Sequence, residues 1–214
     1  MRNSVLASLL ILVLSGCSLL PSPEPAQVWT LDPVPAVTGE PLQVEGLRVL
    51  KPQTSALMRG RHMLVVPEGK PPEVYAGVRW SSAIPELWRN QLISALQRDS
   101  RFSRISSDEV RLAAERVLVS RLDAFQTEYR QGEPVVVIRG HLQLVEASSR
   151  RILAEHTLDL SRKADHAEVA GIVAAFSALS AEMVDEIREW LLALQTGMVT
   201  PASVTSTQAT TAQR

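Results

Sequence analysis

The sequence predicts an α+β fold, in which an antiparallel sheet carries two long amphipathic helices packed on one face. Segments with near-alternating apolar and polar side chains come first along the chain. A helical segment follows, then three more strand-like segments and a second, longer helical segment. The chain has 214 residues, of which 45% are hydrophobic, so it is long enough to bury a sizeable core in one domain.

The strand-like segments are identified by alternation, by valines and by the residues that end them. Residues 42–50 nearly alternate and stop before Pro52, and residues 63–66 stop at Pro67. Alternation is imperfect over residues 116–127, and the valines of this segment favour a strand. Short links, including residues 147–150, which resemble a hairpin turn, predict antiparallel pairing of the last three strands. The remaining predicted strands are residues 74–80, 116–127, 135–146 and 151–160.

Two segments carry one apolar face at helical spacing. Pro85 suits the first turn of the first helix, and Ser82 is available nearby as an N-cap. A shorter helix is predicted over residues 107–115, with Ser107 and Asp108 at its start. The apolar face of the first helix consists of Ile84, Leu87, Trp88, Leu92, Ala95 and Leu96. That of the last helix consists of Val169, Ile172, Val173, Phe176, Leu179, Met183, Val184, Ile187, Trp190, Leu191 and Leu194.

The chain has one cysteine, Cys17, which ends an apolar run too short to cross a bilayer. A positively charged start precedes this run, as in a signal peptide. Leu14-Ser15-Gly16-Cys17 resembles the lipobox of bacterial lipoproteins, in which small residues expose the scissile bond and the thiol carries a diacylglycerol. The resemblance implies cleavage between Gly16 and Cys17, loss of residues 1–16, and acylation of the new amino group. An ordinary secretory signal peptide or a short membrane anchor is the alternative.

Ser18 bears on the membrane in which the acyl chains would lie. By resemblance to enteric-type lipoproteins, a serine after the cysteine is typical of sorting to the outer membrane, with the domain facing the periplasm. Residues 17–27 are then a lipidated, proline-rich tether, and residues 28–194 are a single folded domain. Residues 195–214 are rich in Thr, Ala, Ser and Gln and are predicted to be a disordered tail.

The composition argues against several classes of protein. A net charge of -1 and 4% aromatic residues give no support to nucleic-acid binding. A single cysteine builds neither a disulfide framework nor a cysteine zinc site. His166-Ala167-Glu168 matches the His-x-Glu half of a zinc deaminase signature, but the downstream cysteine pair that this signature requires is absent from the sequence. We predict no catalytic site, no metal site and no cofactor beyond the acyl groups on Cys17, with a lipid-anchored periplasmic enzyme as a rival. The histidines are scattered along the chain: His62, His141, His156 and His166.

The tryptophans near the two long helices differ in what they predict. Trp88 and Trp190 lie on the apolar faces and are expected to fill the interface between helices and sheet. Trp80 precedes the first helix, and two hypotheses remain open for it: a place in the core, or a place on a surface that binds a partner.

The order of these features resembles the ABC-type transport auxiliary lipoprotein component family, whose members are PqiC-like proteins. The resemblance covers about residues 17–194, and it depends on the order of several short motifs after a lipobox. The residues that carry it are Val28-Trp29-Thr30-Leu31, Trp80-Ser81-Ser82 with Pro85, Leu118 to Phe125, Ala175-Phe176-Ser177 and Trp190.

The family resemblance implies a function that the residues alone do not show. It implies an outer-membrane lipoprotein that works with an inner-membrane ABC permease and ATPase and with a periplasmic MCE-domain protein. Such a system moves phospholipid or other hydrophobic compounds between the two membranes, and this subunit would supply docking rather than catalysis. Self-association of the subunit is left open. The alternative is a structural or assembly lipoprotein that partners an outer-membrane barrel or a secretion system.

Overall fold

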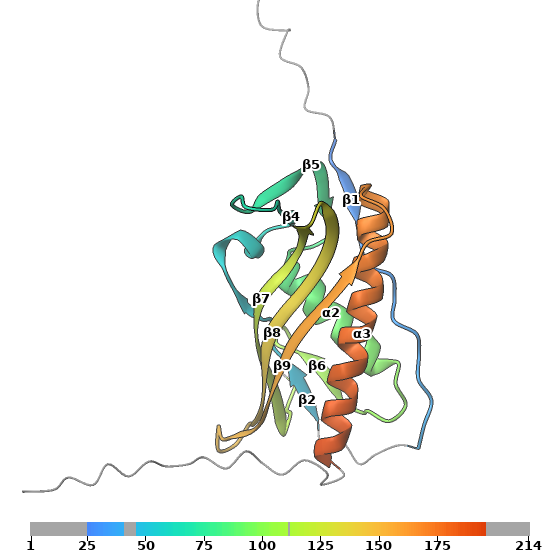
Figure 1. The fold of residues 1–214 in the computed structure, drawn as a ribbon. Coiled ribbons are helices and arrows are strands. Elements are labelled where there is room, and N and C mark those ends of the chain that lie inside the picture. Colours follow the sequence, from blue (N-terminus) through green and yellow to red (C-terminus); the bar gives the residue numbers. More distant parts are fainter. Residues whose placement is uncertain (1–24, 41–45, 111, 196–214) are drawn as a thin grey trace, which may run out of the picture.

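A computed structural model of the chain describes residues 25–40, 46–110 and 112–195. Two α-helices and a curled sheet make up this part of the chain, which confirms the predicted α+β class (Figure 1). The elements are β1 (Gln27–Trp29), β2 (Leu47–Val49), β3 (Gln53–Thr54), the 3-10 helix η2 (Ala56–Arg59), β4 (His62–Val66), β5 (Glu73–Trp80), α2 (Ile84–Gln97), β6 (Ile105–Ser107), β7 (Arg116–Arg130), β8 (Glu133–Glu146), β9 (Ile152–Lys163) and α3 (Val169–Gln195).

The sheet is mixed rather than purely antiparallel. The meander of β7, β8 and β9 is antiparallel along its whole length, as predicted. The other edge of β7 pairs in parallel with β2, β3 and β4, and β1–β5 and β2–β6 are parallel pairs as well. The prediction of an antiparallel sheet is therefore wrong for this half. Alternation along a strand carries no information on its direction, and α2 lies in the long crossovers that lead to the parallel partners β6 and β7.

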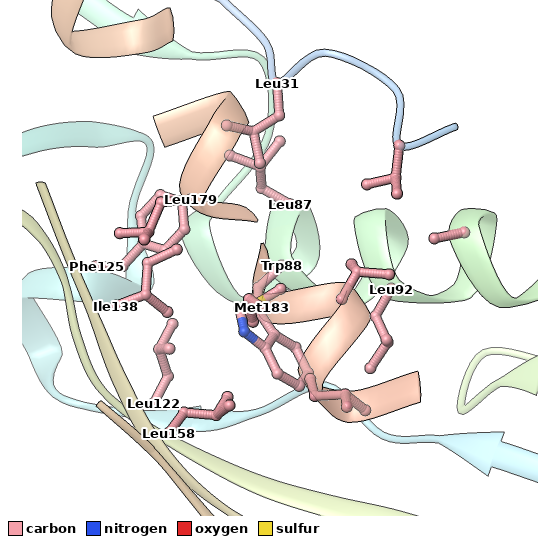
Figure 2. Close-up of a cluster of buried hydrophobic side chains, with 14 of the residues drawn as sticks. Leu31, Leu87, Trp88, Leu92, Leu122, Phe125, Ile138, Leu158, Leu179 and Met183 are labelled. Carbon is pink, nitrogen blue, oxygen red and sulfur yellow. The ribbon is translucent and has the colours of Figure 1, made fainter. Parts of the chain in front are cut away.

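One hydrophobic core joins the sheet to both helices. α3 packs on β8 and β9, and α2 packs on β6 and on α3. Apolar side chains recur on one side of each helix and of each long strand, so these sides meet in a single cluster. Figure 2 shows members of this cluster from the N-terminal segment, the helices and the sheet: Leu31, Leu87, Trp88, Leu92, Leu122, Phe125, Ile138, Leu158, Leu179 and Met183.

The first long helix starts almost where the sequence predicts. α2 begins at Ile84, with Pro85 in its first turn. Its N-cap is Ala83 instead of Ser82, and no side chain caps it. The Ile84 amide donates a hydrogen bond to the carbonyl of Gly60 at 3.0 Å, so neighbouring backbone replaces the side-chain cap.

Two predicted elements differ from the structure. The helix predicted over residues 107–115 is absent, because β6 ends at Ser107 and an irregular loop follows. The side chains that would start such a helix are engaged elsewhere, since the Arg89 guanidinium pairs with Asp108 at 2.5 Å and with Glu109 at 2.8 Å. The strand predicted over residues 42–50 is limited to Leu47–Val49 among the described residues, and residues 41–45 lie outside them.

A β-bulge explains the imperfect alternation of β7. Leu122 pairs with Gly140 and Ala124 pairs with Arg139, so Asp123 is an extra residue without a partner on β8. The extra residue shifts the phase of the strand, which lets Phe125 face the core together with Leu122. Gly140 lies tight against the bulge, because a Cβ built there would meet the Arg121 carbonyl oxygen at 2.5 Å.

Candidate functional site

The described chain starts at one end of the domain, and the opposite end lies far from this start. Gly16, Cys17 and Ser18 lie outside the described residues. The described chain starts just before β1, which shares one end of the domain with the β4–β5 hairpin (Figure 1). β2, β6 and the turn between β8 and β9 lie at the opposite end, which we name the distal end. Within the described ranges, neither helix combines the length and the apolarity needed to cross a bilayer.

Trp80 lies in the core and is not part of a partner surface. Its side chain is 0% exposed and makes edge-to-face contacts with Phe125 at 5.8 Å and with Phe176 at 5.1 Å between ring centroids. Phe125 and Phe176 stack on each other at 4.8 Å. The hypothesis of a partner surface at Trp80 is thus wrong, because the bulge in β7 turns Phe125 inward and closes an aromatic cluster over the indole. Trp88 and Trp190 are buried, as predicted.

A buried charge cluster joins the end of α2 to α3. The Asp99 carboxylate, whose side chain is 0% exposed, lies 2.8 Å from the Arg188 guanidinium and 2.8 Å from that of Arg101. Burial by itself raises the pKa of Asp99, but hydrogen bonds from Arg101 and the charge of Arg188 outweigh it and hold that pKa below its ordinary value. Each charge in this cluster has an opposite charge beside it, so the cluster stabilises the contact between two helices.

A second buried arginine fixes the loop at the distal end. Arg89 of α2 is nearly fully buried and binds both Asp108 and Glu109. Burial by itself lowers the pKa of the Arg89 guanidinium, but its bonds to Glu109 and Asp108 outweigh this and raise it. The same Asp108 carboxylate accepts a hydrogen bond from the Lys51 amide at 3.2 Å. The start of the loop over residues 108–115 is therefore held by charged side chains and has a defined path.

The histidines do not converge on a common site. His156 of β9 bonds Glu186 of α3 at 2.7 Å and stacks on Trp190 at 5.3 Å, which ties the helix to the edge of the sheet. His141 lies on the outer side of β8, 3.5 Å from Asp123. No group of three or more His, Cys, Asp or Glu side chains that could hold a metal ion occurs among the residues with described positions.

Two hollows on the surface of the described residues are candidates for a binding site. One, of about 460 Å³, lies at the N-terminal end of α2 between Lys51, Arg59 and Glu86, and the Lys51 ammonium lies 3.8 Å from Glu86 within it. The other, of about 260 Å³, lies between Asp32 and the small side chains of α3. The residues that line them do not form a nucleophile–base pair, so neither hollow has the arrangement of a catalytic site.

The outer face of the sheet, opposite the core, becomes aliphatic at the distal end. Val117 pairs with Val145, and Val145 pairs with Ile152, so these three side chains form a row across β7, β8 and β9. Their neighbours Leu118 and Leu144 face the core, which places the row on the other side. The Ile152 side chain is 48% exposed.

The loop over residues 108–115 extends this row. Arg48 of β2 is the register partner of Val117, and its guanidinium donates a hydrogen bond to the Leu112 carbonyl. The loop therefore lies against the same end of the sheet, where it exposes Leu112 at 58% and Val110 at 48%. We name Val110, Leu112, Val117, Val145 and Ile152 the distal patch.

The sequence did contain a signal for the distal patch. Val117 and Val119 alternate with Leu118 and Ser120, so the start of β7 is apolar on both faces. An apolar residue on both faces is normal for a strand covered on both sides. Only the packing of α2 and α3 on one side of the sheet shows that, among the described residues, the second face is left uncovered.

A known family model matches most of the described chain. The model of the ABC-type transport auxiliary lipoprotein component matches residues 29–188. No curated protein matches the chain in sequence.

Solved structures show the same fold. A protein from Xanthomonas campestris superimposes with a TM-score of 0.74 at 18% sequence identity, over 81% of this chain and 98% of the other. An uncharacterized protein superimposes with a TM-score of 0.61 at 18% identity, over 78% of this chain and 99% of the other. At these identities the likeness concerns the fold alone.

Proposed function

Because this chain belongs to the family of ABC-type transport auxiliary lipoprotein components, we propose that it is an outer-membrane lipoprotein of an intermembrane lipid transport system. A diacylglycerol and an N-acyl chain on Cys17 hold the domain in the periplasm. There it docks a periplasmic MCE-domain protein that works with an inner-membrane ABC permease and its ATPase. The cargo is a phospholipid or another hydrophobic compound.

The observation that carries the proposal is the family match, which spans the domain from β1 to the last turns of α3. The arrangement of charged groups supports a docking role rather than a catalytic one. The buried charges of Asp99, Arg188 and Arg89 are all paired and hold elements of the domain together. ATP hydrolysis belongs to another subunit in this proposal.

Acylation accounts for a permanent attachment to the membrane. Each buried methylene contributes about 0.8 kcal/mol, and one myristoyl chain gives only reversible binding, so two or three chains are needed for a stable anchor. We expect Cys17→Ala to release the domain from the outer-membrane fraction. A second variant with residues 1–16 replaced by a cleavable secretory signal peptide controls for retention through an uncleaved apolar run.

The direct test is copurification from cells. A C-terminally tagged full-length chain, extracted in mild detergent, is expected to copurify the permease, the ATPase and the MCE-domain protein, and mass spectrometry would identify them. Copurification of an outer-membrane barrel or of a secretion component without these three would overturn the proposal. Deletion of the gene is expected to lower tolerance of detergents, and unchanged tolerance and lipid asymmetry in the deletion strain would contradict the transport role.

A further inference from the structure

The distal patch leaves large aliphatic side chains in water although they lie in ordered elements. Ile152 is the first residue of β9 and pairs with Val145 of β8, and Leu112 belongs to a loop held by Arg48 and, through Asp108, by Arg89. Exposure of these side chains is therefore a property of the folded domain and not of a loose segment. Because burial of apolar surface is favourable in proportion to its area, a partner that covers the patch gains affinity.

The rest of the outer face is different. Next along the strands, Val119 lies beside Gln143, which bonds Glu155 at 2.7 Å, and Arg121 bonds Asp123 at 2.8 Å. These polar side chains satisfy one another within the domain. The aliphatic row is thus confined to one end of the face, which is the pattern of a local binding surface rather than of a generally apolar sheet.

Arginines border the patch on the side of the β8–β9 turn. Arg150 has no ion-pair partner within the described part of the chain, and the Arg151 side chain is 69% exposed with its nearest carboxylate, Glu146, at 3.9 Å. The acidic residues of the loop are already bound, since Asp108 and Glu109 pair with Arg89 and Glu115 pairs with Arg104. The border therefore presents net positive charge.

These observations lead to one occupant. Resting on the proposed function, we propose that the distal patch docks an aliphatic surface with acidic flanks on the periplasmic protein of the transport system. A second copy bound through the same patch would bring the arginines at positions 150 and 151 of the two copies together, and the repulsion between like charges disfavours this contact. A membrane surface does not fit either, because the patch lies at the end of the domain opposite β1, next to which the described chain begins.

The test uses the tagged full-length lipoprotein and the copurification described above. Ile152→Glu places a charge in the patch, and Val74→Glu is its control, because Val74 of β5 is equally exposed at 48% and lies outside the patch. We expect roughly a tenfold loss of copurified MCE-domain protein for Ile152→Glu and none for Val74→Glu. Arg150→Glu combined with Arg151→Glu is expected to weaken capture as well, with Lys70→Glu in the β4–β5 hairpin as the control.

A photoreactive amino acid at position 152, compared with one at position 74, identifies the occupant in intact cells. A position-152 adduct with the MCE-domain protein supports the inference. Adducts with a second copy or with phospholipid, or equal adducts at both positions, overturn it.

If the wild-type chain copurifies the transport proteins and Ile152→Glu captures them equally well, the patch is wrong and the proposed function stands. If the wild-type chain captures none of them, the proposed function fails and the inference fails with it.

Discussion

The two faces of the β7–β8–β9 meander are under different constraints. The inner face carries Leu122, Phe125 and Ile138, which are almost fully buried against the helices. The outer face carries pairs of charged side chains in water, such as Arg121 with Asp123 at 2.8 Å, and ends in the distal patch. Both faces belong to the same strands and share one set of backbone hydrogen bonds.

The difference shows where folding leaves residues free to serve binding. A large side chain removed from the inner face leaves a cavity, which costs several kcal/mol. An exposed ion pair on the outer face contributes about 0.2–1 kcal/mol, because water competes for both partners. Sequence changes on the outer face are therefore expected to leave the domain folded, and the following substitutions test this difference.

The largest effect is expected at the aromatic cluster of the inner face. Phe176→Ala removes a ring that contacts both Trp80 and Phe125, and the resulting cavity should lower the free energy of unfolding by about 3–5 kcal/mol. Urea unfolding followed by tryptophan fluorescence and circular dichroism measures the change. A loss below about 1 kcal/mol would mean that the cluster is not part of the core.

The buried charge at the end of α2 is expected to rank next. Asp99→Ala leaves Arg188 without its carboxylate in the interior, which should cost about 3 kcal/mol. Because the folded-state pKa of Asp99 is depressed, its contribution is present above the unfolded-state pKa of about 3.9 and is lost as pH falls through the folded-state value. Unfolding free energies measured from pH 7 down to pH 3 should therefore fall less steeply for Asp99→Ala than for the wild type. Parallel curves would contradict the pairing, and Glu189→Gln, at an exposed partner of Arg101, is the control.

Changes at the β7 bulge are expected to have an intermediate effect on stability, since the bulge decides which residues of β7 face the core and which face outward. Gly140→Ala drives a methyl group into the Arg121 carbonyl and should cost about 1–3 kcal/mol. Deletion of Asp123 in the same chain removes the bulge and should recover part of that loss. Thermal unfolding of the three proteins decides the matter, and an alanine at position 140 that leaves the midpoint unchanged would show that the backbone adjusts freely there.

The smallest effect on stability is expected in the distal patch. Ile152→Glu changes a half-exposed position at the start of β9 and should shift the free energy of unfolding by about 0.5 kcal/mol or less, although we expect the same change to weaken partner capture. Chemical unfolding of the purified domain measures it. A loss comparable to that of Phe176→Ala would place Ile152 in the core and remove the contrast between the faces.

Much of the fold could be predicted from local patterns. The helical periods of α2 and α3 and the three strands of the meander depend on residues close in sequence, and their predictions are confirmed. The helix predicted over residues 107–115 had suitable start residues, but Arg89 of α2 binds one of them, Asp108, together with Glu109. At this loop a tertiary ion pair outweighs local helix propensity, and such a pair cannot be recognised from the residues of the loop alone.

Short stretches of chain are enough to predict the helical and strand periodicities, the family resemblance and a lipid anchor at Cys17. Three features emerge only when the chain is folded: half of the sheet is parallel, Trp80 is buried beneath Phe125 and Phe176, and Val117, Val145 and Ile152 form one row. All three have one cause. Strand direction, the closure of the core and the makeup of a surface depend on which distant segments become neighbours, and that is fixed when the whole chain packs.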